Sequence, residues 1–288
     1  MPKVFLFILI CIILTGCEKE VTVDLPQGEE HFVVEGHIEN GQFPYVILTK
    51  DAPYFASVDT ADLDKYFVKG ADVKVSNGDT TISMMEIQDG IYVGFSMIGE
   101  VNKSYDLTII VEGKTLTSTT YIPTPMPQID SLWAIAKEGY SNVFRIWFTY
   151  SDPDTTGNNI KIFTKVNDDI FRTFLFSTFD DHVINGKTFD DIIRNGIDES
   201  CYPENPADTA STSNFAVEEC GLFKIGDTVE VKISSIDRAH FDFWRTLETE
   251  SSNSGGPFSS PTVIKSNIEG GLGIWGGYGS VTRTIIVK

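Results

Sequence analysis

The sequence predicts a mainly β chain: an N-terminal β-sandwich of immunoglobulin-like or transthyretin-like type, then a second β-rich domain with one short helix. Apolar and polar residues alternate in short runs, and glycine turns separate these runs. The segment Pro123-Thr124-Pro125-Met126-Pro127 then divides the chain, because alternating prolines cannot continue a sheet ladder. We therefore expect the sandwich over residues 31–122, a proline-rich linker over 123–129 and the second domain over 130–288.

The first domain begins with Phe32, Val34 and Ile38 on one face of a strand, and Asn40-Gly41 marks a hairpin turn. Further strands are expected at Tyr45–Thr49, Ala71–Ser76, Thr80–Ile87, Ile91–Phe95, Tyr105–Val111 and Leu116–Ile122. The long loop Asp51–Lys69 carries Tyr54, Phe55, Tyr66 and Phe67. These aromatic residues either contact a partner or pack over an open end of the sandwich.

The second domain combines strands with a single amphipathic stretch. Strands are expected at Phe144–Tyr150, Ile160–Val166, Ile170–Phe176, Thr228–Ser234 and Thr282–Val287. Ala239–Glu250 places Phe241, Trp244 and Leu247 on one stripe at helical spacing, so it predicts the helix.

Gly271-Leu272-Gly273-Ile274-Trp275-Gly276 satisfies the dinucleotide-binding pattern, but that pattern requires a following helix. Here it leads into another strand. We expect a glycine-kinked strand, in which bare backbone lets Trp275 or Tyr278 lie against a neighbour.

The N-terminus has the features of a secretory signal. Lys3 precedes an apolar run of eleven residues, Val4–Leu14, and a small-residue site follows. At ~1.5 Å per helical residue this run spans ~17 Å, too short for the ~30 Å hydrocarbon layer. Leu14-Thr15-Gly16-Cys17 resembles a bacterial lipobox. Residues 1–16 would then be removed, Cys17 would carry two or three lipid chains, and residues 17–30 would form the tether. The alternative is an ordinary secreted protein.

Glu18-Lys19-Glu20 resembles the short signal that sends Bacteroidota lipoproteins to the outside of the outer membrane. We expect an outer-membrane protein that is lipid-anchored and faces the cell exterior, with the inward-facing leaflet as the alternative. Loss of Lys3 leaves 41 acidic and 21 basic residues, a net charge of −20. Such a chain repels phosphate backbones, so we expect no nucleic-acid partner.

Four cysteines are present, and Cys11 leaves with the signal. Because Cys17 accepts the lipid, Cys201 and Cys220 remain, and two thiols in an exported protein usually pair. A disulfide that closes this loop would contribute about 3 kcal/mol. The alternative is two buried free thiols.

The sequence contains no familiar catalytic pattern. The four histidines are scattered, and Asp152-Pro153-Asp154-Thr155-Thr156-Gly157 departs from an EF-hand at its fifth and twelfth positions. The paired carboxylates Asp168-Asp169, Asp180-Asp181 and Asp190-Asp191 would need to converge in a cleft to act as acid and base. We expect no catalytic, cofactor-binding or metal-binding residue.

A short Asp-Thr/Ser pattern resembles the O-glycosylation acceptor of Bacteroidota exported proteins, although Asp-Thr is also common where turns enter strands. The candidate acceptors are Thr60, Thr80, Ser131, Thr155, Thr209 and Thr228.

Several stretches, taken in order, carry a resemblance over nearly the whole mature chain. They are Cys17-Glu18-Lys19-Glu20, Phe32-Val33-Val34-Glu35-Gly36-His37-Ile38, Val68-Lys69-Gly70-Ala71-Asp72-Val73-Lys74-Val75, Asp89-Gly90-Ile91-Tyr92, Tyr105-Asp106-Leu107-Thr108-Ile109, Ser151-Asp152-Pro153, Asn158-Asn159, Asp180-Asp181-His182-Val183-Ile184-Asn185-Gly186-Lys187 and Asn267-Ile268-Glu269-Gly270-Gly271-Leu272-Gly273. Together they resemble the Bacteroidota lipoproteins of domain-of-unknown-function family 4249. Ile160-Lys161 departs from the family, which usually has an aromatic pair there.

The resemblance implies a lipoprotein commonly encoded beside large TonB-dependent receptors. We therefore expect a non-enzymatic outer-membrane surface lipoprotein that is an accessory or ligand-capturing partner of a TonB-dependent receptor. The alternatives are a surface enzyme that hydrolyses glycans or peptides and a structural or adhesive envelope protein.

Overall fold

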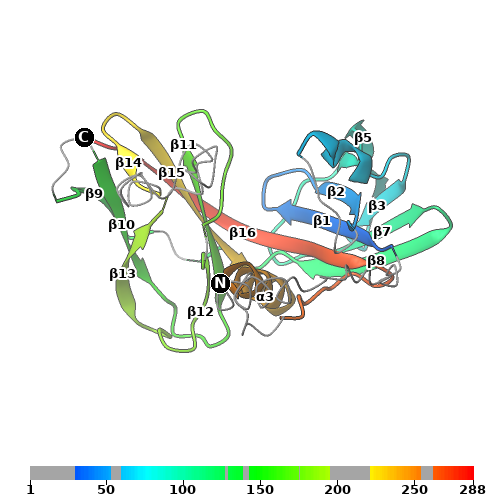
Figure 1. Ribbon diagram of the computed structural model, residues 1–288. Helices are drawn as coiled ribbons and strands as arrows, with labels where there is room; N and C mark the ends of the chain where they lie inside the picture. Colours follow the sequence, from blue (N-terminus) through cyan, green and yellow to red (C-terminus); the bar gives the residue numbers. More distant parts are fainter. Residues whose placement is uncertain are drawn as a thin grey trace, which may run out of the picture.

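The computed structural model describes residues 30–52, 60–126, 129–138, 143–174, 176–194, 221–253 and 262–288 (Figure 1). The prediction of a mainly β chain with one helix is confirmed in these residues. The elements of the first part of the chain are β1 (Phe32–Glu39), β2 (Tyr45–Lys50), the 3-10 helix η1 (Thr60–Tyr66), β3 (Asp72–Ser76), β4 (Thr81–Ser83), β5 (Met85–Gln88), β6 (Ile91–Val93), β7 (Ser104–Val111) and β8 (Lys114–Tyr121). Those of the second part are β9 (Ser131–Ala136), β10 (Val143–Ser151), β11 (Asn159–Val166), β12 (Thr178–Asp180), β13 (Thr188–Ile193), β14 (Phe223–Lys224), β15 (Thr228–Ile236), α3 (Arg238–Asn253) and β16 (Leu272–Ile286).

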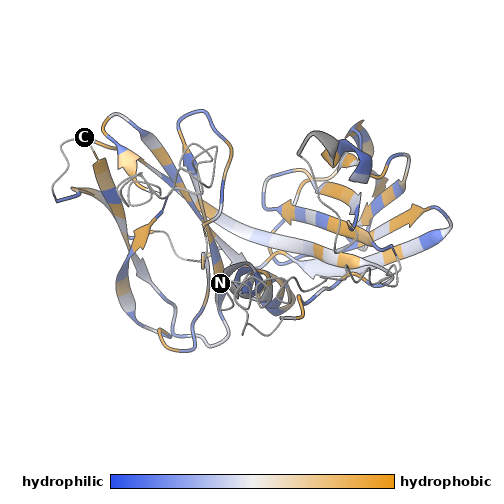
Figure 2. Cartoon of the chain, in the orientation of Figure 1, coloured by the Kyte–Doolittle hydropathy of each residue, from blue (hydrophilic) through white to orange (hydrophobic). Residues whose placement is uncertain are grey.

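One long sheet belongs to both halves of the molecule. Its eight strands follow the order β12-β11-β15-β16-β1-β2-β6-β5. The sheet β4-β3-β7-β8 shares a core with the β1 end, and the sheet of β13, β10, β14 and β9 shares a second core with the β11 end. Apolar and polar residues alternate along these strands in Figure 2, as the period of two predicts.

Strand β16 connects the two sandwiches (Figure 1). Residues 272–278 pair in parallel with β1, and residues 279–286 pair antiparallel with β15. The division at residues 123–129 lies between β8 and β9, and residues 272–278 return to the sheet of the first sandwich. The end of the chain therefore belongs to both halves.

The glycines of β16 allow close contacts on its two faces, and this stretch is pale in Figure 2. A Cβ on Gly277 would overlap the carbonyl of Tyr121, and one on Gly279 would overlap the carbonyl of Pro123. On the other face, a Cβ on Gly276 would overlap the ring of His240. The proline-rich linker and the helix thus both contact the bare backbone of one strand.

The expectation that this glycine-rich stretch forms a strand, with Trp275 against a neighbour, is confirmed. Trp275 is fully buried beside Gly36, and its indole N–H donates to the carbonyl of Tyr105 over 2.9 Å. The expected helix is also confirmed as α3.

Two expected strands differ from the structure. Thr80–Ile87 is divided into β4 and β5, which belong to different sheets, and the intervening Met84 donates its N–H to Val73. The expected strand at Ile170–Phe176 is wrong for its described residues, which form a single bridge, from Arg172 to Thr164. Left-handed backbone at Phe176 ends the extended conformation there.

Within the described ranges, no helix has both the length and the apolar character needed to cross a membrane.

We predict that Gly277→Ala destabilises the protein by more than about 3 kcal/mol, because backbone rather than a flexible side chain occupies the space of the new Cβ. Thr282→Ala, at an exposed position of the same strand, is the control and should change the free energy of unfolding by no more than about 0.5 kcal/mol. Urea denaturation of both variants measures this. Equal stability of the two would contradict the close crossing.

Candidate functional site

The most concentrated set of buried ionisable groups lies where α3 packs on the long sheet. The helix begins after Asp237, whose carboxylate accepts from the N–H of His240 over 2.8 Å, as an N-cap residue does. His240, Trp244 and Glu248 follow at intervals of four residues and share one face of α3. That face meets β11 and β16.

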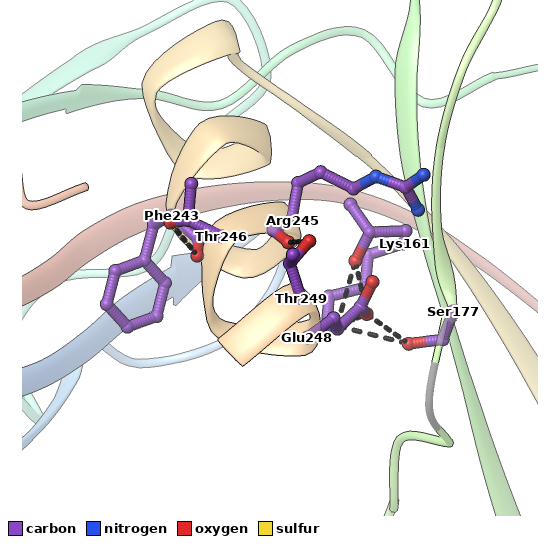
Figure 3. A network of polar contacts seen from close by, with 8 residues as sticks. Lys161, Ser177, Phe243, Arg245, Thr246, Glu248 and Thr249 are labelled. Carbon is purple, nitrogen blue, oxygen red and sulfur yellow. Dashed lines mark hydrogen bonds and ion pairs between the residues drawn. The ribbon is translucent and has the colours of Figure 1, made fainter. Parts of the chain in front are cut away.

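Lys161 of β11 lies at the centre of this contact, and 1% of its side-chain surface is exposed. Its ammonium donates to Ser177 Oγ and Thr178 Oγ1 over 3.1 Å each, and to Glu248 Oε1 over 3.3 Å. Figure 3 shows Lys161 with Ser177 and with Glu248 of α3. The same ammonium lies 4.1 Å from the centre of the Trp244 ring. Lys161 is one of the two residues, Ile160 and Lys161, at which the sequence departs from the aromatic pair usual in the family. Both side chains are buried.

Burial lowers the pKa of Lys161 to about 8, although the Glu248 carboxylate opposes this change. A lysine with such a pKa can serve as a base where substrate reaches it. Here the amine is enclosed by α3 and its hydroxyl partners, so we interpret the network as the contact that fixes the helix to the sheet.

His240 is fully buried against Gly276 and Tyr278, with 4.6 Å between the centres of the His240 and Tyr278 rings. Neither ring nitrogen has a hydrogen-bond partner among the described residues, nor do Trp244 Nε1 and Glu248 Oε2. Burial lowers the pKa of His240 to about 3, with smaller contributions from the charges of Lys161 and His37. The imidazole is therefore neutral in the folded protein at neutral pH.

An ion pair joins the two sandwiches beside this helix. Lys232 of β15 contacts Glu39 of β1 over 2.8 Å, and its ammonium also lies over the rings of Phe163 and Phe171 at 4.8 and 4.6 Å. Neighbouring His37 has its pKa lowered to about 4, first by burial and then by Lys232. The charge of Lys232 is thus paired with Glu39 across the junction and packed against aromatic rings on its own side.

The paired carboxylates each have separate partners. Asp169 pairs with Arg172, Asp181 accepts from the N–H of Asn158, and Asp190 accepts from Thr149. Asp152 is buried, and burial, followed by the nearby Asp181, raises its pKa. In the part of the chain that the structure describes, no group of three or more His, Cys, Asp or Glu is placed to hold a metal ion.

The predicted modification sites are distributed over the chain. Cys17, Cys201, Cys220 and Thr209 lie outside the described residues. Thr80 and Thr155 are exposed on turns, whereas Ser131 and Thr228 are half-buried at the starts of β9 and β15. Thr60 begins η1. Where described, exposure of the hydroxyl favours Thr80 and Thr155 as acceptors.

Of the aromatic residues in the long loop, Tyr54 and Phe55 lie outside the described residues. Phe67 pairs with Thr49 and would contact any side chain at Gly90, so it packs on the sandwich. An exposed apolar surface lies elsewhere, on Phe43, Met85, Phe95 and Ile98, which we name the apolar strip. Each member has between 41% and 62% of its surface exposed.

Backbone contacts join the segments that carry the apolar strip. Phe43 and Phe95 meet edge to face with 5.6 Å between ring centres, and Gly94 donates to the carbonyl of Pro44. Met85 pairs with Val93, and Gly41 donates to Gly99 beside Ile98. Sequence reasoning missed this surface because its members come from three separate turns and strands.

A family model described as a domain of unknown function (DUF4249) matches residues 18–284. The search of curated proteins found no match to the chain.

We predict that Lys161→Met destabilises the protein by about 3–5 kcal/mol, because it leaves the Glu248 carboxylate buried without its cation. The double variant Lys161→Met/Glu248→Leu should recover most of this loss. Lys165→Met, at a half-exposed ion pair on the same face of β11, is the control and should cost no more than about 1 kcal/mol. Urea denaturation measures the free energy of unfolding of each variant. Additive effects of Lys161→Met and Glu248→Leu would contradict an energetic coupling between the two side chains.

We also predict a dependence of stability on pH from His240. The pKa of His240 is lower in the folded state than in the unfolded chain. The unfolded chain therefore binds a proton at His240 below about pH 6.5, whereas the folded protein binds this proton only below about pH 3. The free energy of unfolding therefore falls as the pH falls through this range, by about 2 kcal/mol between pH 7 and pH 5 from this residue.

Urea denaturation at pH 7 and pH 5 measures the effect. His240→Gln should lower the dependence by that amount, whereas the exposed His182→Gln should leave it unchanged. A dependence that both variants share with the parent protein would exclude His240 as its source.

Proposed function

Because the chain belongs to a family of unknown function, DUF4249, we propose its role from its sequence and surface: a non-enzymatic, lipid-anchored accessory protein of a TonB-dependent outer-membrane receptor. In this proposal, Cys17 carries the lipid and the body faces the cell exterior. The protein captures ligand or caps the transporter.

The observation that carries the proposal is the apolar strip. Exposed apolar patches larger than a few hundred Å² are rare on monomeric soluble proteins and mark interaction sites, and the four residues of the apolar strip lie on neighbouring segments with Phe43 and Phe95 in contact. Two aromatic rings in mutual contact offer rigid contact area at low cost in conformational entropy, as in the centres of protein interfaces.

The position of the apolar strip also suits a protein partner. The proposed tether leads into the start of β1, whereas Phe43 follows the end of β1. The eight residues of β1 separate its two ends by about 26 Å. Asn40, at the base of the same turn, bonds both backbone groups of Ser280 in β16. The apolar strip is therefore fixed to the junction between the sandwiches and set apart from the membrane attachment.

The buried ionisable groups support a binding role over a hydrolytic one. Lys161 and His240, which have strongly altered pKa values, are enclosed by α3, where they form part of the contact between helix and sheet.

The test is co-purification from native membranes with a tagged chain. We predict that the native protein brings down a TonB-dependent receptor, identified by mass spectrometry, and that Phe43→Ser/Phe95→Ser lowers the recovered receptor at least tenfold. Ile135→Ser, which alters an apolar residue of similar exposure in the second sandwich, is the control and should retain the receptor. Failure of the native protein to bring down any such receptor would refute the proposal.

A further inference from the structure

The outward face of the second small sheet has an unusual arrangement of side chains. Leu132 and Ala134 of β9, with Ile146 and Phe148 of β10, point into the core. The residues between them therefore point away from the core, because side chains alternate across a strand. On this face Trp133 and Trp147 are direct cross-strand partners.

The rings of the two tryptophans are nearly parallel and stacked. Their ring centres are 6.4 Å apart, and the ring planes differ by 16°. Both are half-buried, and Ile192 of β13 continues the row because it pairs with Trp147. A row of two aromatic side chains and one aliphatic side chain thus crosses three strands on the solvent side of the sheet.

A polar row lies beside the aromatic row, two residues further along each strand. Ser131 donates to Thr149 Oγ1 over 2.7 Å, and Thr149 donates to the exposed Asp190 carboxylate over 2.6 Å. Two residues on a strand span about 6.7 Å, which sets the distance between the rows.

A second polar row follows, where Ser151 donates to Asp130 over 2.6 Å and lies 2.7 Å from Thr188 Oγ1. Asp130 also lines a hollow of about 620 Å³ with Ile129, Val281, Thr282 and Arg283.

This pattern has a definite chemical counterpart. A pyranose ring presents a flat face of C–H groups and an edge of hydroxyl groups, and its width is close to the distance between the rows. The C–H face can lie on an indole, whose π-face is negative, while the hydroxyls bond to Ser, Thr and Asp side chains. The net charge of −20 on the mature chain disfavours an acidic ligand.

We propose that the outward face of β9, β10 and β13 binds a neutral glycan, with Trp133 and Trp147 as the stacking platform and the Ser131–Thr149–Asp190 row as the hydrogen-bonding edge. This site lies on a different sandwich from the apolar strip, and it does not rest on the proposed receptor partner. The amphipathic row pattern favours a glycan over a protein, for which a purely apolar centre is more typical.

Affinity electrophoresis of the full mature chain in gels that contain soluble neutral polysaccharides (dextran, xylan, galactomannan, mixed-linkage β-glucan) tests the proposal. We expect at least one to retard the native protein. Trp147→Ala should weaken the retardation at least tenfold, Asp190→Ala several-fold, and Trp147→Phe less than Trp147→Ala. Thermal unfolding of each variant shows that it is folded, and the surface variant Asp190→Ala tests the site if Trp147→Ala does not fold.

The control is Phe43→Ser/Phe95→Ser, which should keep full retardation. Conversely, Trp147→Ala should still bring down the receptor, so failure of one proposal is distinguishable from failure of the other. No retardation by any of the four polysaccharides, or equal retardation of native protein, Trp147→Ala and Asp190→Ala, would overturn the glycan site. Capture of a protein through this face without polysaccharide retardation would overturn it as well.

Discussion

The close approach of two segments to the bare backbone of β16 is the constraint on which the arrangement depends. The chain at the end of β8 crosses at Gly277, the linker backbone crosses at Gly279, and His240 packs at Gly276 on the other face. A side chain at any of these positions would separate the layers, and the interior of a protein tolerates such expansion poorly. The two sandwiches are therefore joined through a shared strand and a packed linker. A proline-rich segment that would act as a free spacer in isolation is here part of the core.

The α3 contact shows a different balance of forces. Phe241 and Tyr278 form a small apolar cluster with Ile236, so little apolar burial holds the helix. The Lys161–Glu248 ion pair fixes the orientation of the helix on the sheet. Burying the two charges costs desolvation free energy, and their mutual attraction only offsets this cost. Buried atoms of His240, Trp244 and Glu248 that have no hydrogen-bond partner among the described residues add to this cost. We interpret the network as a device that fixes the position of the helix, in which specificity outweighs net stabilisation.

Local patterns of the sequence predict much of the fold. The alternation of apolar and polar residues predicts the strands β1, β7, β10 and β15, and the apolar stripe of Phe241 and Trp244 predicts the helix α3. Each of these patterns arises because one side of a single element is buried. The parallel pairing of β1 with β16 is not predictable in this way, since its partners are more than 230 residues apart. The same limit applies to the candidate sites. Phe43 and Phe95, or Trp133 and Trp147, become neighbours through strand register, which no single segment contains.

The joined sandwiches also determine how the two proposed surfaces would work together. The turn that carries Phe43 of the apolar strip is bonded to β16 through Asn40 and Ser280. The glycan face belongs to the sandwich that the other half of β16 completes. Ligand bound on one surface would thus be held at a fixed distance from a receptor bound on the other. The proposed tether of residues 17–30 could reach at most about 50 Å when fully extended. It would let the whole body turn over a membrane partner, while the geometry between the two surfaces stays constant. In these proposals, such a body on a lipid tether would suit the delivery of captured material to one receptor.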